Sequence, residues 1–208
     1  MDRRNFLKLG STSLAIGAIG ASNPASAFLN CSAINGNQAQ QCEAGISSTL
    51  AHISAASVGG QHNTQWCWAA CIEMVFKYYG FHVPQEAIVQ QTWGQIVNLP
   101  GQPNHILANL NRPWIDSNNN RFRVTGDSYS ANPITAAQDL ANNMPLIIGT
   151  MGHAMVLTSL QYTRSRWGNG NVTAAIVRDP WPGRGRRVLT APEWYNTSFL
   201  ARIRVNQA

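Results

Sequence analysis

Charged side chains are scarce in this chain of 208 residues. Asp, Glu, Lys and Arg together make up 12% of it, about half of the roughly 25% that is typical of globular domains. Only nine residues are acidic, against 15 Lys and Arg, so the formal net charge is +6. Asn, Gln, Ser and Gly are plentiful instead. A surface that is polar but mostly uncharged is compatible with an exported protein.

The chain also lacks a long hydrophobic run, internal repeats and nucleic-acid-binding signatures. Its N-terminal apolar stretch, residues 9–21, has 13 residues, whereas a membrane-spanning helix needs about 20. Nothing resembles a zinc finger, a basic zipper or an RNA-binding motif, so we expect no nucleic-acid partner. The length and the 44% hydrophobic content predict one domain with a proper core. We expect it to be a monomer.

The N-terminal segment has the three parts of a cleavable export signal in the usual order. Arg3 and Arg4 come first, the apolar stretch follows, and Ala25 and Ala27 form an A-x-A cleavage site. This order resembles a twin-arginine signal peptide comprising residues 1–27. We therefore expect a periplasmic or secreted protein without stable membrane insertion after cleavage.

Arginines cluster near the C-terminal end. Six of them fall within 24 residues: Arg164, Arg166, Arg178, Arg184, Arg186 and Arg187. The arginine fork binds carboxylates and phosphates, so an acidic ligand or an anionic surface is compatible with this segment. A solvated basic loop is the simpler interpretation.

The four cysteines form two pairs with different expectations. Cys31 and Cys42 would close a loop of about 12 residues, and a disulfide there would stabilise an exported chain by roughly 3 kcal/mol. Cys67 and Cys71 are four residues apart on one predicted helix, where the rigid backbone disfavours a disulfide between them. We expect Cys71 to be a buried core thiol.

Hydrophobic periodicity predicts an α+β fold. Residues 28–60 show no sustained period and are interpreted as an N-terminal arm or loop. A strong amphipathic helix begins at Cys67 and ends at Gly80. Shorter helices are predicted at 84–92, 103–110 and 133–143, and strands at 145–150, 153–163, 171–180 and 199–205. Helices followed by antiparallel strands are typical of α+β proteins.

Cys67 is a candidate nucleophile within the stretch QHNTQWCWAAC, residues 61–71. Unpaired backbone N–H groups and the positive dipole end at a helix start favour a thiolate. His153 is the candidate base, because it begins an apolar strand that would fix its backbone. Asp179 ends the next strand, where its carboxylate could orient the imidazole.

An acyl-transfer site also needs hydrogen-bond donors for the oxyanion. The backbone N–H of Cys67 is one candidate, and a glutamine amide from the preceding loop is the other. Gln61 and Gln65 could both serve.

These motifs resemble those of the papain-like cysteine peptidases. A Gln six positions before Cys-Trp-Ala, then GHAMVLT, then an acidic residue after the following strand, are together fairly specific. They are similar to a compact bacterial branch that includes plant-pathogen effector proteases and is related to bacteriocin-leader peptidases. The resemblance covers roughly residues 58–182. It implies Cys67 as nucleophile, His153 as base, Asp179 as orienting residue and Gln61 as oxyanion donor.

The implied fold has the nucleophile on a central N-terminal helix packed on an antiparallel sheet, with residues 61–208 as the catalytic domain. The implied activity is hydrolysis of a protein or peptide by a secreted thiol peptidase, without cofactor or metal. Plant and lysosomal papains have Asn as the third member, where this chain offers Asp179. The same triad also serves amidases, deamidases and transglutaminase-like acyl transferases, and a non-catalytic papain-fold binding module is a further alternative.

Overall fold

The computed structural model describes residues 26–168 and 170–207. The expected export signal lies outside these residues, apart from its last two positions. The described helices are α1 (Ser48–Val58), α2 (Cys67–Tyr78), α3 (Gln85–Trp93), α4 (Pro103–Asn109), α5 (Pro133–Ala141) and α6 (Ala191–Tyr195). None of them is long and apolar enough to cross a membrane.

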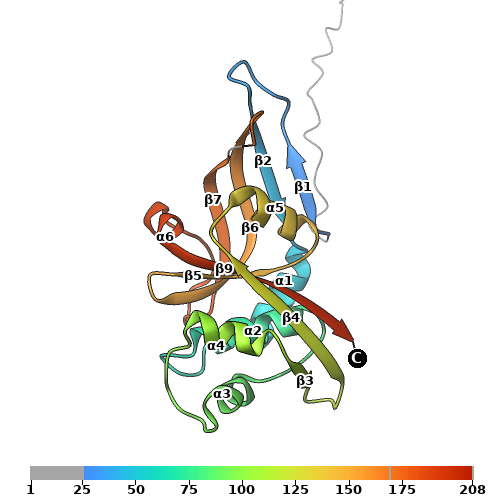
Figure 1. Ribbon diagram of the computed structural model, residues 1–208, viewed down its shortest axis with the longest axis vertical. Coiled ribbons are helices and arrows are strands. Elements are labelled where there is room, and N and C mark those ends of the chain that lie inside the picture. Colours follow the sequence, from blue (N-terminus) through green and yellow to red (C-terminus); the bar gives the residue numbers. More distant parts are fainter. Residues whose placement is uncertain (1–25, 169, 208) are drawn as a thin grey trace, which may run out of the picture.

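A large antiparallel sheet forms the centre of the molecule (Figure 1). Its strands are β1 (Phe28–Cys31), β2 (Ala39–Gly45), β3 (Pro113–Ile115), β4 (Arg121–Tyr129), β5 (Leu146–Thr150), β6 (His153–Ser165), β7 (Gly170–Asp179), β8 (Gly185–Val188) and β9 (Thr197–Gln207). The order is β1-β2-β6-β5-β9-β4-β3, and β7 pairs with β6 and β8. Helices mixed with this sheet confirm the predicted α+β class.

Helix α2 is the central helix that the periodicity predicted. Trp68, Cys71, Ile72, Val75 and Phe76 are all fully buried, and they recur at helical spacing. The helix packs against α1, α3, α4 and β6, and Figure 1 shows α2, α3 and α4 gathered at one end of the sheet. Its first residue is therefore held in place by contacts on several sides.

The N-terminal arm is not irregular, so this prediction was wrong. Residues 28–60 contain β1, β2 and α1, and β2 pairs with β6 along its whole length. Ser47 caps α1 by accepting from the backbone N–H of Leu50, and Gly59 ends the helix in the left-handed conformation. The sequence AQQCEAG of β2 has no apolar alternation that would predict a strand. The segment is a strand because it pairs with the edge of β6, not because of its local propensity.

A disulfide joins Cys31 to Cys42, which confirms the predicted pairing. The two residues lie directly opposite each other in the β1–β2 ladder. The bond therefore fastens the first described strand to a strand that belongs to the central sheet.

Candidate active site

Cys67 is the first residue of α2 and is half-buried. Its neighbours Trp66 and Trp68 are buried, and their indole N–H groups donate to the carbonyl oxygens of Val97 (2.8 Å) and Leu99 (3.2 Å). The first turn of a helix leaves its N–H groups without intrahelical acceptors. The thiol is therefore held rigidly beside a set of backbone donors.

The second free thiol differs from the first in its surroundings. Cys71 is fully buried one turn further along α2. Burial, followed by the nearby Cys67 and Asp179, raises the pKa of Cys71 well above its usual value. Cys71 is the core thiol that the sequence predicted.

His153 is positioned by a tight hairpin between β5 and β6. Met151 and Gly152 form the turn with positive φ angles of 49° and 77°, as expected for a two-residue turn that matches the twist of the strands. Thr150 and His153 are the last paired residues of the ladder. The imidazole is consequently carried by the first residue of β6, whose backbone is fixed by the sheet as predicted.

The structure brings Cys67, His153 and Asp179 together. The Nε2 atom of His153 lies 2.7 Å from Oδ1 of Asp179, and His153 and Cys67 line the same cleft. Since Nε2 faces the carboxylate, Nδ1 is the nitrogen left for the sulfur. Burial lowers the pKa of His153, but the hydrogen bonds and charges of Asp179 and Cys67 outweigh it and raise the pKa to about 9.

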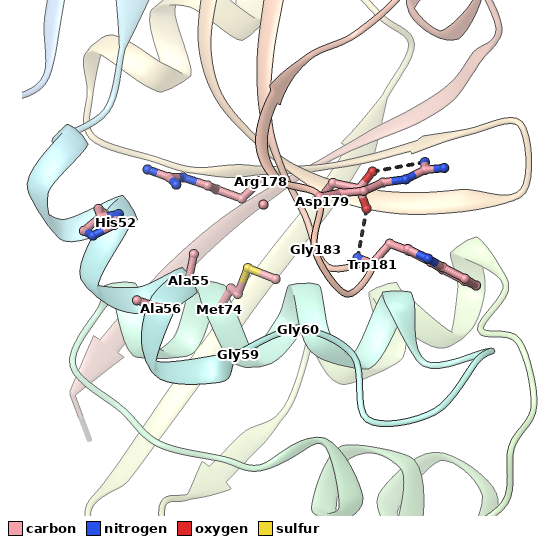
Figure 2. Close-up of a pocket in the computed structure, with 12 residues that line it drawn as sticks. His52, Ala55, Ala56, Gly59, Gly60, Met74, Arg178, Asp179, Trp181 and Gly183 are labelled. Carbon is pink, nitrogen blue, oxygen red and sulfur yellow. Dashed lines mark hydrogen bonds and ion pairs between the residues drawn. The ribbon is translucent and has the colours of Figure 1, made fainter.

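The Asp179 carboxylate is buried and has further donors. The backbone N–H of Trp181 donates to Oδ1 at 2.9 Å (Figure 2), and Arg187 Nε donates to Oδ2 at 2.8 Å. Burial raises the pKa of Asp179, but the hydrogen bonds from His153, Trp181 and Arg187 hold it well below its usual value of 3.8. This carboxylate is therefore ionised at neutral pH and fixed in direction.

Arg187 joins Asp179 to a second carboxylate, a role that sequence reasoning missed. Its two terminal nitrogens donate to Glu193 at 2.9 and 2.6 Å. Glu193 also accepts from the backbone N–H and the hydroxyl of Thr190 in the capping box of α6. Hydrogen bonds from Arg187 and then from Thr190 lower the pKa of Glu193 to about 2, with burial opposing them. The Arg cluster was the only sequence signal for this contact.

The side-chain amide of Gln61 is held by its own loop, and Gln61 is not among the residues that line the cleft at Cys67 and His153. Its amide nitrogen donates to the carbonyl oxygens of Asn63 (2.8 Å) and Thr64 (3.0 Å), and its buried Oε1 has no partner among the described residues. Its backbone N–H donates to the Pro180 carbonyl at 2.8 Å, which ties the loop before α2 to the turn after Asp179. Gln65, the other candidate, is exposed beside Cys67.

A cleft of about 270 Å³ opens at the thiol and the imidazole. One wall comes from residues 100–106 and the other from the β5–β6 turn and β9. Asp179 does not line it, because this carboxylate lies behind the imidazole. Within the described ranges, no group of three or more His, Cys, Asp or Glu side chains is arranged to hold a metal ion. The chemistry available here is therefore that of a half-buried thiol paired with a cationic imidazole beside an open cleft.

Comparison with known proteins agrees with this geometry. Residues 52–199 match the family model described as papain-like cysteine protease AvrRpt2. The match begins inside α1 and ends in β9, so it includes the thiol, the imidazole and the carboxylate. No curated protein matches the chain.

Proposed function

Since this chain belongs to the family of the papain-like cysteine protease AvrRpt2, and is thus a cysteine peptidase, we propose that Cys67, His153 and Asp179 are its catalytic triad. The observation that supports the proposal most strongly is that the imidazole of His153 lies 2.7 Å from the Asp179 carboxylate and lines one cleft together with Cys67. Gln61 and the backbone N–H of Cys67 complete the site as oxyanion donors.

Catalysis starts from a thiolate on Cys67 and an imidazolium on His153. The raised pKa of His153, about 9, keeps the ring protonated at neutral pH, and the N-terminal end of α2 favours the negative charge on sulfur. The sulfur attacks the carbonyl carbon of a peptide bond lying in the cleft. A tetrahedral intermediate forms with its negative charge on the former carbonyl oxygen.

His153 then donates its proton to the leaving amine, and the C–N bond breaks to leave a thioester on Cys67. The neutral imidazole next accepts a proton from water, which attacks the thioester and releases the new carboxylate. Asp179 stabilises the imidazolium and keeps Nδ1 directed at the sulfur, without taking a proton itself.

The oxyanion is stabilised by donors from the loop before α2 and from the start of the helix. The backbone N–H of Cys67 is one donor. Gln61 supplies the second by giving up one of its two bonds to the carbonyl oxygens of Asn63 and Thr64. The family pattern, with Gln six residues before the nucleophile, favours Gln61 over Gln65.

We further propose that the protein is exported through the twin-arginine signal and cleaved after Ala27. The mature chain would then begin at Phe28, the first residue of β1. The Cys31–Cys42 disulfide is in keeping with a periplasmic or extracellular location. Replacing Arg3 and Arg4 together by Lys should leave precursor in the cytoplasm, since the pair is read by a receptor. Normal export of that variant would disprove the signal assignment.

The proposed activity is tested with the purified protein and its Cys67→Ala variant. Each is incubated with casein and with a peptide library, and products are identified by mass spectrometry while ammonia release is followed in parallel. New peptide termini produced only by the wild-type protein support an endopeptidase that uses Cys67. Ammonia release without new termini would instead identify a deamidase or a transglutaminase-like enzyme.

A further inference from the structure

A second cavity, of about 350 Å³, lies beside Asp179 but outside the cleft. Its walls come from α1, from the end of β7 and from the turn between β7 and β8, and no residue lines both spaces. Figure 2 shows the space between α1 and β7, with His52 and Arg178 on one side and Trp181 on the other. The proposed catalytic steps make no use of it.

Arg178 lines this cavity and has no hydrogen-bond or ion-pair partner among the described residues. Its Nε atom is buried without a hydrogen bond to any described residue, and none of the ion pairs in the described part of the chain includes it. Arg187, nine positions later, has two carboxylates. Arg178 as a whole is half-buried, but its buried Nε–H group has no acceptor and so costs free energy, which a bound anion would recover.

A second arginine increases this positive charge. Arg186 lies directly opposite Arg178 in the β7–β8 ladder, and like charges in such a pair repel each other. Burial, and then the charge of Arg186, lower the pKa of Arg178. Both side chains line an adjoining hollow of about 200 Å³ together with Glu43. The described ion pairs join Glu43 to neither arginine; its side chain accepts instead from Gln161 at 3.3 Å.

The other walls of the cavity suit the rest of a small organic molecule. His52 can donate a hydrogen bond from α1, while Ala55, Met74 and Trp181 offer apolar surface. The carboxylate of Asp179 does not compete for Arg178, because His153, Arg187 and Arg184 already surround it. Figure 2 shows the side chains of Arg178 and Asp179 pointing in opposite directions from β7.

We propose that this cavity is a binding site for a small organic anion, whose phosphate or carboxylate head is held by Arg178 and His52 and whose apolar part contacts Met74 and Trp181. The arginine fork matches the geometry of both head groups. The site goes beyond the proposed peptidase activity and does not depend on it.

The test measures binding directly, so that it is independent of catalysis. The purified protein is titrated with phenyl phosphate, benzoate and inorganic phosphate by isothermal titration calorimetry at constant ionic strength. The first two probes separate a phosphate from a carboxylate head, and the third shows what the apolar part contributes. We expect saturable binding of phenyl phosphate or benzoate, and Arg178→Met should weaken it by at least about tenfold, the value of one charge-assisted hydrogen bond.

Arg123→Met is the matched control, because Arg123 is an exposed arginine on β4 that does not line the cavity. Its affinity for the probe should equal that of the wild-type protein. The proposal is overturned if neither phenyl phosphate nor benzoate binds to the wild-type protein, or if Arg178→Met binds them as well as Arg123→Met does. Should Arg178→Met fail to fold, His52→Ala on the exposed face of α1 replaces it, with a weakened affinity expected on the same grounds.

Discussion

Arg187 donates from Nε to Oδ2 of Asp179 at 2.8 Å, while His153 lies 2.7 Å from the other carboxylate oxygen. The two contacts occupy opposite oxygens of one buried group. Arg187 is itself held by Glu193, so a chain of charges runs from the start of α6 to the proposed nucleophile. We infer that Arg187 positions Asp179 and thereby the imidazole.

Replacing Arg187 by Met should therefore change the acid limb of the pH–rate profile, the range in which kcat/KM falls as the pH is lowered. Arg187 is one cause of the low pKa of Asp179, so in the variant this pKa rises and kcat/KM is lost at a higher pH than in the wild-type protein. Removal of one partner from a buried ion pair should also lower the free energy of unfolding by about 3 kcal/mol. Both effects are measured, by a pH–rate profile and by urea titration.

The stability effect has a defined pH window. The folded-state pKa of Asp179 lies below its usual value of 3.8, so its contribution is fully present above that pH and disappears as the pH falls further. Arg187→Lys retains the charge but not the forked guanidinium. Its free energy of unfolding and the acid limb of its pH–rate profile should therefore lie between those of Arg187→Met and those of the wild-type protein. An unchanged acid limb in Arg187→Met would show that Arg187 has only a structural role.

The basic limb of the pH–rate profile should reflect the loss of the proton from His153. Its pKa is raised to about 9, so kcat/KM is expected to decline as the pH rises through this value and the imidazolium loses its proton. In Asp179→Asn the main contact that raises the pKa is weakened, and the decline should begin at a lower pH. An identical basic limb in both proteins would contradict the proposed pairing.

The two free thiols should differ in alkylation. Cys67 lies half-buried beside His153, whereas Cys71 is fully buried. A short pulse of iodoacetamide at about pH 6 should modify Cys67 and leave Cys71 unmodified, because only the thiolate reacts. His153→Ala should slow labelling of Cys67 markedly, and Asp179→Ala should have a smaller effect.

Peptide mapping by mass spectrometry identifies the alkylated residue. Equal labelling of the two cysteines, or no labelling of Cys67 in the folded protein, would leave the proposed nucleophile without support. Such a result would favour a binding module that retains the fold.

The glutamine that stabilises the oxyanion is identified by a pair of variants. Gln61→Ala should lower kcat by about 10²-fold, as expected for one lost oxyanion donor, and should not prevent folding. Gln65→Ala is the matched control, since Gln65 lies two residues before Cys67 and lines the cleft. If Gln65→Ala has the large effect and Gln61→Ala does not, the second donor is Gln65.

Local sequence was sufficient for the elements that carry the thiol and the imidazole. The period of α2 is visible because its buried residues recur along one chain segment, and the hairpin before His153 has Gly152 at its turn. Cys67, His153 and Asp179 could be chosen as neighbours because they follow a recognisable family pattern, and they do lie together. Their catalytic roles stay predictions until the variants are measured.

Only the tertiary structure decided the features that depend on residues from separate segments. Strand β2 has no strand-like pattern of its own and exists because β6 offers an edge. The partners of the arginines could not be predicted from the sequence either. The β7–β8 hairpin brings Arg187 to Asp179 but leaves Arg178 facing Arg186. The sequence gives the number of arginines but not their contacts. The contribution of each arginine to stability depends on which acceptor lies within a few ångströms of it, and the packing of the folded chain sets that distance.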